Sequence, residues 1–233
     1  MQKPICVVVG IGPGNGSALA RRWASEGYRV VLLGRDPARL ADWEEKIPGS
    51  KGFVCDAADP ESVTSAYASV RAELGSVETL LYNAGSGVWG GLDAVDENAL
   101  LDSLRVDAVG LLLAAKQVVP DMRAAGRGTI AVIGAGAAWR GRASTLAFAS
   151  AKAAQRSIAQ SLARELGPRG IHVFYVVIDG VIDLPRTRAR MANKPDEFFL
   201  QPDDIALSVW DVAHQPRTAW SFEIDLRPFG ESW

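Results

Sequence analysis

Short apolar runs alternate along this chain with longer segments of mixed polarity. The runs are apolar throughout and rich in β-branched residues, which predicts buried strands, and the mixed segments have helical spacing. The predicted strands span residues 5–9, 28–33, 51–55, 77–82, 128–134, 171–178 and 219–226. The predicted helices span residues 14–27, 38–46, 97–125, 145–166 and 203–214, with another helix starting near residue 59 and a loop with a short helix over 181–193.

Strands that are apolar along their whole length are typical of a parallel sheet covered by helices on both faces. The alternation therefore predicts an α/β protein with a three-layer, doubly wound Rossmann fold and a mostly parallel sheet of seven strands. No linker or shift in composition divides the 233 residues, so we expect a single domain over residues 1–233.

The composition argues against several classes of function. The chain is 48% hydrophobic and 22% charged, with a formal net charge of −2 and no basic stripe. We therefore expect a protein that binds neither nucleic acid nor a membrane. The chain enters its first strand without a signal-peptide pattern. Cys6 and Cys55 fall in predicted strands and are expected to be packed thiols, which fits a reducing cytoplasm, and no metal site is expected.

The first strand runs into a glycine-rich loop and then a helix, an arrangement that places a pyrophosphate on the helix N-terminus. In this interpretation Gly10 allows a sharp turn, Gly14 lets the backbone approach a phosphate, and Gly16 lets helix and strand pack closely. We expect Asn15 or Ser17 to cap the helix. The alternative is an ordinary glycine-rich turn. The cofactor-binding residues expected in this loop are Gly10, Gly12, Gly14, Asn15 and Gly16.

Further candidate residues follow other predicted strands. Because the carboxyl ends of parallel strands meet at one edge, we expect these residues to share a rim with the glycine loop. They are Arg35, Asp56, Asn83, Ala84, Gly85 and Gly134.

Four motifs in order resemble the short-chain dehydrogenase/reductase family over almost the whole chain. The spacing Gly10-x-x-x-Gly14-x-Gly16 is similar to that of the family's glycine motif, with Val9 in place of the usual threonine. Asp56 lies where the family has an aspartate that meets the adenine. Asn83-Ala84-Gly85 resembles the end of the family's NNAG motif, with Tyr82 replacing its first asparagine. Phe148 to Lys152 lies where the family has Tyr-x-x-x-Lys. The resemblance implies an NAD(P)(H) cofactor and a contact from the Ile182 backbone to the nicotinamide carboxamide.

The end of the second strand bears on which dinucleotide binds. NAD-binding proteins usually place an acid there for the ribose 2′-hydroxyl, whereas this chain has Gly34 followed by Arg35. A guanidinium suits the 2′-phosphate of NADP, so we expect NADP to be preferred and NAD to remain possible. Asp36 complicates this prediction because it could pair with Arg35 or repel the phosphate.

The chain departs from the family in its chemistry. The resemblance implies that a tyrosine donates the proton, a lysine lowers its pKa and holds the ribose, a serine orients the substrate, and an asparagine anchors a water chain. Only Lys152 is retained: Phe148 occupies the tyrosine position, residues 134–136 offer no side-chain oxygen at the serine position, and Asp107 replaces the asparagine. An atypical branch of the family shows the same exchange of tyrosine for phenylalanine. The usual mechanism should be severely weakened, because a positioned acid contributes about 10²–10⁴-fold.

Other groups leave alternatives open. Lys152 could itself act as the acid, with Asp107 relaying protons, although a simple ion pair of the two is favoured. Tyr82 is expected on the rim, as packing beside the adenosine or as a displaced acid. Ser144 and Thr145 are expected to cap a helix. His172 and His214 are isolated, and a structural role is expected for His172.

Two function classes remain. The first is an oxidoreductase acting on an unidentified small carbonyl or alcohol, and the second is a catalytically silent dinucleotide-binding sensor or assembly subunit. Arg186, Arg188 and Arg190 could attract an acidic substrate, although a solvated basic segment is favoured. The apolar stretch 111–119 and the alanine-rich helix 145–166 predict a homodimer or homotetramer.

Overall fold

Seven parallel strands form the central sheet in the computed structural model, which describes residues 3–230. Their order is β3-β2-β1-β4-β5-β6-β9, so the chain changes direction across the sheet between β1 and β4. The strand class, number and parallel pairing predicted from the apolar runs are confirmed. The strands are β1 (Ile5–Val9), β2 (Arg29–Gly34), β3 (Lys51–Val54), β4 (Thr79–Tyr82), β5 (Gly128–Ile133), β6 (Ile171–Ile178) and β9 (Glu223–Leu226).

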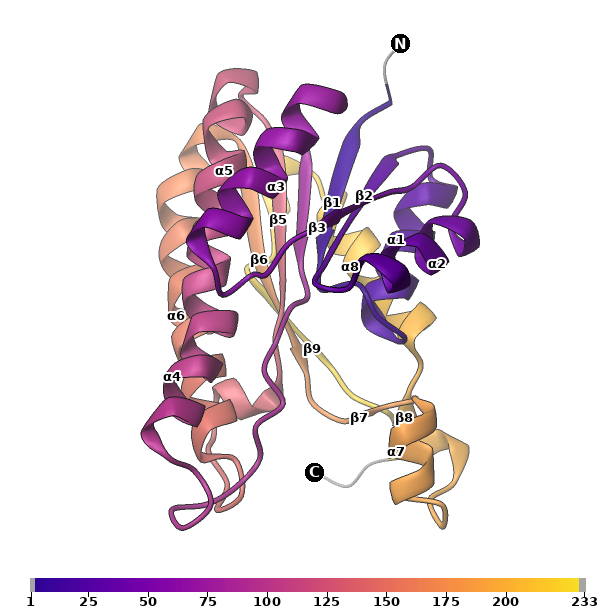
Figure 1. The fold of residues 1–233 in the computed structure, drawn as a ribbon, viewed down its shortest axis with the longest axis vertical. Coiled ribbons are helices and arrows are strands. Elements are labelled where there is room, and N and C mark those ends of the chain that lie inside the picture. The colour runs from indigo at the N-terminus through magenta and orange to yellow at the C-terminus, as the bar shows by residue number, and fades with distance from the viewer. Residues whose placement is uncertain (1–2, 231–233) are drawn as a thin grey trace.

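Helices cover both faces of this sheet, which gives the three layers (Figure 1). The buried residues form two clusters, one on each side of the sheet. One face is covered by α3 (Pro60–Glu73), α4 (Glu97–Leu104), α5 (Gly110–Ala125) and α6 (Leu146–Leu166). The other is covered by α1 (Asn15–Ser25), α2 (Pro37–Lys46) and α8 (Pro202–Ala213). Within residues 3–230, no helix is long and apolar enough to cross a membrane.

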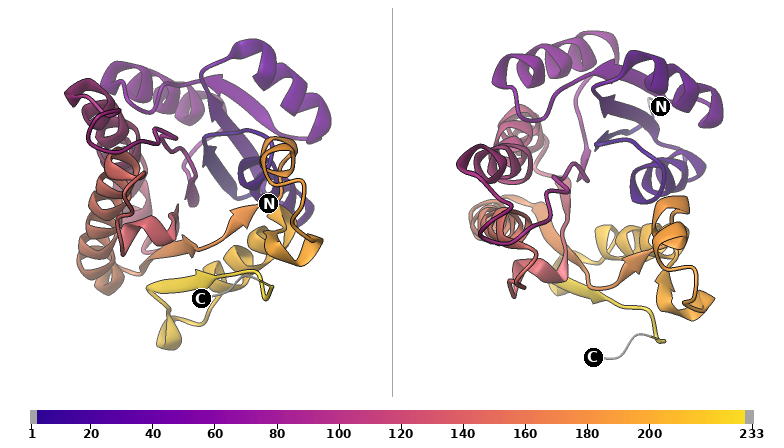
Figure 2. Two further views of the ribbon diagram at one scale, coloured as in Figure 1. Left: turned by 90° about the horizontal axis from the view of Figure 1, so that it is seen from below. Right: turned by 60° about the horizontal axis from the view of Figure 1, so that its bottom comes forward.

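The segment 181–200 lies apart from the main sheet, below the carboxyl ends of the strands (Figure 2). It contains β7 (Val181–Ile182), α7 (Pro185–Arg190) and β8 (Phe199–Leu200). Strands β7 and β8 pair in parallel and form a small second sheet. This segment overhangs the edge where the predicted rim lies.

The predicted helix over residues 97–125 is divided by a π-helical turn, Arg105–Val109, between α4 and α5. The hydroxyl of Tyr82 donates a hydrogen bond to the carbonyl of Val106 within that turn. Burial raises the pKa of the Tyr82 phenol well above its usual value. Tyr82 ends β4 at the carboxyl edge, as expected, but its side chain is fully buried and its hydroxyl supports the π-helical turn instead of facing the rim.

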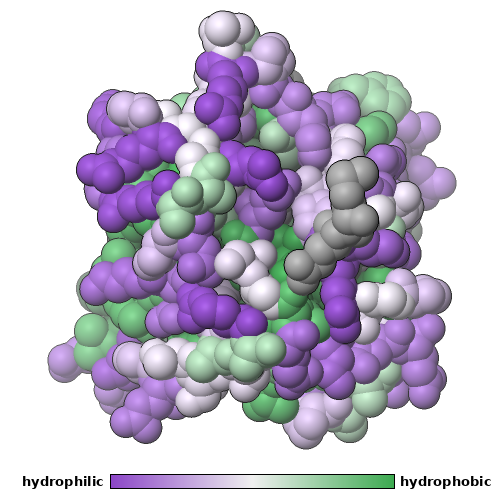
Figure 3. Space-filling model, turned by 90° about the horizontal axis from the view of Figure 1, so that it is seen from above, coloured by the Kyte–Doolittle hydropathy of each residue, from purple (hydrophilic) through white to green (hydrophobic). Residues whose placement is uncertain are grey.

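The amino ends of the strands form the opposite face of the molecule, which is mostly hydrophilic (Figure 3). His172 lies near this end of β6, buried, with its ring stacked on Trp220 at a centroid distance of 4.6 Å. The structural role expected for His172 agrees with this packing. The predicted last strand begins later than expected, at Glu223, because a short 3₁₀ turn at Arg217–Ala219 precedes it. Cys6 and Cys55 are buried and free, as expected.

Candidate functional site

The glycine loop and the loop after β4 meet at the carboxyl edge of the sheet. Asn83 Nδ2 donates a hydrogen bond of 2.8 Å to the carbonyl of Gly10. Gly10 has φ +89°, and a Cβ there would lie 2.6 Å from the backbone nitrogen of Ala84. The positive φ and the close approach of Ala84 both require glycine at position 10. The hydrogen bond from Asn83 links the two loops.

The helix that follows the loop begins without a side-chain cap. The predicted capping by Asn15 or Ser17 is wrong, because Ser17 Oγ instead donates to the Gly14 carbonyl and Asn15 is already the first residue of α1. Asn15 Oδ1 is buried with no hydrogen-bond partner in the described chain. The uncapped N–H groups at the start of α1 and the empty space at the Cβ position of Gly12 fit a bound dinucleotide phosphate.

The turn after β2 presents Arg35 to solvent. The neighbouring Asp36 is engaged with the helix that follows: its Oδ1 accepts hydrogen bonds from the backbone N–H groups of Ala38 and Arg39 at 3.0 and 3.2 Å, and its Oδ2 lies 3.4 Å from Arg39 Nε. Asp36 is thus the N-cap of α2. At the end of β3, Asp56 Oδ1 accepts from the Ala58 N–H and shapes its own turn.

Lys152 projects from α6 into a buried network under the loop after β4. Its Nζ donates to the Ile133 carbonyl at 3.2 Å and to Gln155 Oε1 at 3.1 Å, and it lies 2.8 Å from Asp107 Oδ1. Only 6% of its side chain is exposed. The first two contacts are hydrogen bonds, and the third is an ion pair, since Asp107 Oδ1 accepts no hydrogen bond within the described chain. The charge of Lys152 is therefore balanced inside the protein.

Asp107 is the partner that balances this charge. It lies in the π-helical turn with its side chain fully buried, and its Oδ2 accepts from the Ser86 N–H at 2.9 Å. Gln155 Nε2 donates to the Asp107 carbonyl, which ties α6 to the same turn. Gly85 lies against the pair, since a Cβ there would be 3.2 Å from Asp107 Oδ1. The favoured alternative for Asp107, an ion pair with Lys152, is the arrangement observed.

Phe148 lies one helical turn before Lys152 and stacks on Trp89. Their ring centroids are 5.1 Å apart and their planes are inclined by 24°. Trp89 belongs to the loop after β4 and is 61% exposed. A backbone bridge between Gly90 and Thr145 joins this loop to the start of α6, so the aromatic pair is held from both sides. The position where the family has its proton donor is therefore occupied by an apolar ring, Phe148, stacked on Trp89.

The end of β5, where the family has its serine, is filled by side chains from β6. A Cβ at Gly134 would lie 2.0–2.2 Å from the ring and hydroxyl oxygen of Tyr175. A Cβ at Gly136 would lie 1.9 Å from Asp179 Oδ1. Tyr175 is buried, its hydroxyl donates to the Lys152 carbonyl at 3.4 Å, and burial raises its pKa above the ordinary value.

Thr145 does not cap α6 as predicted. Its hydroxyl bonds within the preceding loop, accepting from the Arg142 N–H and donating to the Arg142 carbonyl. Ser144 is exposed, and its carbonyl accepts from the Gly90 N–H.

Segment 181–200 is held by ion pairs. Arg188 Nε and Nη2 contact the two carboxylate oxygens of Asp183 at 2.7 and 2.8 Å, and Arg188 Nη1 contacts Asp196 at 2.5 Å. These bonds lower the pKa of Asp183 to about 2. Thr187 Oγ1 donates to the Ile182 carbonyl at 2.6 Å. Arg188 is therefore a structural residue rather than a free cation for a substrate.

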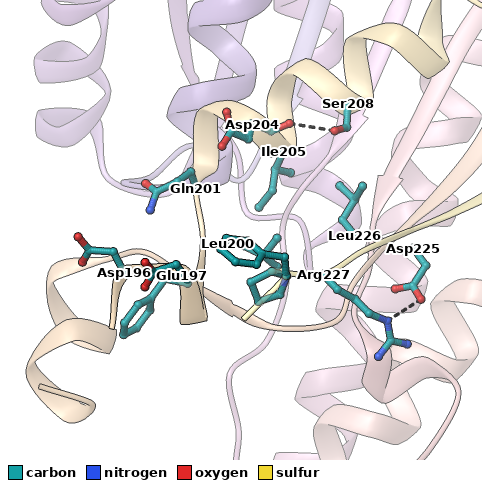
Figure 4. A pocket seen from close by; sticks show the side chains of 13 residues that line it. Asp196, Glu197, Leu200, Gln201, Asp204, Ile205, Ser208, Asp225, Leu226 and Arg227 are labelled. Atoms are coloured by element: carbon teal, nitrogen blue, oxygen red, sulfur yellow. Dashed lines mark hydrogen bonds and ion pairs between the residues drawn. The ribbon is translucent and has the colours of Figure 1, made fainter. Parts of the chain in front are cut away.

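A pocket of about 530 Å³ lies between segment 181–200, α8 and the end of β9 (Figure 4). Its acidic side chains include Asp196, Asp204 and Asp225, and Arg227 contacts Asp225 at its edge. Neither Phe148 nor Lys152 lines this pocket. It is therefore separate from the site built around the glycine loop.

Several residues of the site carry no motif signal. Gln155, Tyr175 and Asp179 act through contacts between elements distant in sequence, and Thr187 bonds within its own segment. One signal was available for Tyr175: a bulky polar residue inside the most continuous apolar strand needs a buried partner.

The family model for short chain dehydrogenases matches residues 4–195, and the chain belongs to the short-chain dehydrogenase/reductase family. An uncharacterized oxidoreductase of Staphylococcus saprophyticus is 28% identical over 98% of this chain and 98% of its own. A short-chain dehydrogenase from Rhodopseudomonas palustris has a TM-score of 0.84 at 27% identity, covering 98% of this chain and 100% of that chain. A metagenomic short-chain oxidoreductase solved in complex with NADP has the same TM-score and identity, covering 98% of both chains.

Proposed function

We propose that this protein is an NADP(H)-dependent oxidoreductase acting on a small molecule, with a hydride transfer site that lacks the family's tyrosine acid. The observation that carries the cofactor choice is the orientation of Asp36. Its carboxylate caps α2 and pairs with Arg39, and no ion pair joins it to Arg35 within the described residues. Exposed Arg35 is then available for a 2′-phosphate. The NADP complex of a relative 27% identical supports the same cofactor.

The chain's own residues have separate roles in this proposal. The open N-terminus of α1 with Gly12, Gly14 and Gly16 would hold the pyrophosphate, Asp56 the adenine, and the Ile182 backbone the carboxamide. Lys152 would hold the ribose by exchanging one of its present partners. A bound nicotinamide would supply a hydride at the edge lined by Phe148.

Oligomerisation through α5 and α6 also remains a proposal. Leu111, Val118 and Val119 are buried within one chain, which leaves less free apolar surface than the sequence alone suggested. Leu112 and Val109 keep 38% and 41% of their surface exposed. A dimer in light scattering that dissociates in Leu112→Glu would support pairing at this surface, and a wild-type monomer would contradict it.

The cofactor proposal is tested by titrating NADPH and NADH into wild type, Arg35→Ala and Arg29→Ala. Arg29 is the matched control, because it is also exposed but lies at the amino end of the same strand. We expect Arg35→Ala to weaken NADPH about 10- to 100-fold, the range of a lost charge-assisted hydrogen bond, and to leave NADH unchanged. Equal affinities for NADPH and NADH in the wild type would contradict the preference.

A further inference from the structure

Four hydroxyl groups around the site are engaged with backbone carbonyls. Tyr82 donates to Val106, Tyr175 to Lys152, Thr145 to Arg142 and Thr187 to Ile182. Both tyrosines are fully buried, and burial raises the pKa of each. None of these four groups is placed to give a proton to a substrate.

The ammonium of Lys152 is also engaged with groups inside the protein. It contacts Ile133, Gln155 and Asp107, and the last contact is a buried ion pair. Giving up its proton would leave the Asp107 carboxylate buried beside a neutral amine, which is costly. Ser86 and Ser144 remain: Ser86 Oγ shares a hydrogen bond of 2.9 Å with Ser103 Oγ, and Ser144 is exposed. An alcohol whose hydroxyl is not linked to an ionisable side chain can orient a substrate better than it can protonate one.

The surface that faces a substrate here is aromatic. Trp89 stacks on Phe148 and keeps 61% of its surface exposed, and Trp139 in the loop after β5 is 39% exposed. Asp179, which follows β6, is neutralised by Arg140 and Arg227 at 2.7 and 2.6 Å, and the loop that carries Trp89 has an exposed carboxylate at Asp93. An exposed indole face attracts a cation through its ring quadrupole.

We propose that the substrate class is an iminium ion, a carbon–nitrogen double bond carrying a positive charge, bound against Trp89. This inference rests on the proposed function, which it deepens. A hydride adds to the iminium carbon, the π pair of the C=N bond moves onto nitrogen, and the product is a neutral amine. The reduced dinucleotide loses the two electrons and becomes its oxidised form. Charge balances and no proton is transferred.

A carbonyl substrate would make a different demand on the site. Hydride addition to a C=O bond leaves an alkoxide, which needs a proton at the moment of transfer. Phe148 and residues 134–136 offer no side-chain donor at that point, and Tyr175 fills the space where a serine would stand. An iminium ion removes the need for the missing tyrosine and also explains the aromatic surface.

The test compares N-methyl dihydroisoquinolinium with the neutral ketone α-tetralone, which has a similar ring system. NADPH oxidation is measured with both, and binding of both is measured by calorimetry without cofactor. We expect kcat/KM for the iminium to exceed that for the ketone by at least about 10²-fold, the lower value of a positioned acid. We expect the iminium, but not the ketone, to bind measurably.

Two variants sharpen this test. Trp89→Leu should weaken iminium binding about 3- to 30-fold, the range of a cation–π contact, and Trp43→Leu should leave it unchanged. Trp43 is the control because it is a partly buried tryptophan on α2, across the sheet. Equal kcat/KM for ketone and iminium, or iminium binding unaffected in Trp89→Leu, would overturn the proposal. Failure of NADPH to bind would instead contradict the proposed function, and the cofactor-free affinities would still decide the substrate class.

Discussion

The two ends of the binding edge are built on opposite principles. At the cofactor end, after β1 and β2, the chain leaves space and free backbone: α1 begins uncapped, a Cβ at Gly12 would meet nothing within 4 Å, and Arg35 is exposed. At the chemical end, after β5 and along α6, side chains fill the space and satisfy one another. A single fold can thus keep a binding site open while closing the positions that carried its acid chemistry.

The contrast is sharpest between Gly12 and Gly134. Both are glycines at the ends of strands or in the loops after them, but only Gly134 is pressed by a neighbouring side chain, the ring of Tyr175. Gly12 therefore marks open space in its loop, whereas Gly134 marks a position that the Tyr175 ring fills.

The largest loss of stability is expected from removing the side chain that fills the chemical end. Tyr175→Ala should lower the free energy of unfolding by about 3–5 kcal/mol, because it empties a fully buried aromatic site. Gly134→Ala should be destabilising alone and nearly neutral in the Tyr175→Ala background, since its clash is then removed. Urea unfolding of the two single variants and the double variant measures this coupling. Additive losses would show that the two positions are independent.

The buried ion pair should show a comparable effect. Asp107→Ala leaves Lys152 charged and buried without its partner, which should cost about 3–5 kcal/mol. Asp102→Ala removes an exposed pair with Arg105 on the same helical stretch and should cost no more than about 0.5 kcal/mol. Chemical denaturation of both variants gives the comparison. Similar losses in the two would contradict the special status of the buried pair.

The opening at the cofactor end depends on backbone conformation. Gly10→Ala should lose at least about 1–3 kcal/mol and its NADPH affinity, because φ is +89° and the new Cβ would meet Ala84. Gly12→Ala is the matched control: no atom lies within 4 Å of its Cβ position, so its stability should change by less than about 1 kcal/mol. Thermal unfolding with and without NADPH distinguishes them. Equal destabilisation would refute this difference between the two glycines.

The fold and the cofactor end could be largely predicted from local patterns. Apolar runs, helical spacing and glycine positions act within a few residues, so the sequence alone predicts seven strands and places Gly10, Asn83 and Arg35 at one edge. The filled end could not be predicted, because Tyr175 meets Gly134 across neighbouring strands and Gln155 meets Asp107 across helices. Two predicted helix caps were also wrong, because the hydroxyls of Ser17 and Thr145 donate to backbone carbonyls instead of accepting from helix N–H groups.

The smallest effect on stability is expected from the Asp183 carboxylate in segment 181–200. The folded-state pKa of Asp183 is about 2, below its ordinary 3.8, so its contribution to stability is present above pH 3.8 and lost as the pH falls through 2. Asp183→Asn should remove that dependence and speed amide exchange in this segment at neutral pH, with little change elsewhere. An Asp183 titration by NMR near its ordinary value would contradict the ion pair with Arg188.

In this proposal the protein binds its cofactor but lacks an acid at the position of the family's tyrosine. The most direct test compares wild type with Phe148→Tyr. NADPH affinity is measured by fluorescence titration, and α-tetralone reduction by NADPH oxidation. The account predicts the same affinity within about twofold and a ketone rate that rises in Phe148→Tyr toward the roughly 10²–10⁴-fold that a positioned acid supplies. A wild-type ketone rate as high as that of Phe148→Tyr, with NADPH bound in both, would contradict it.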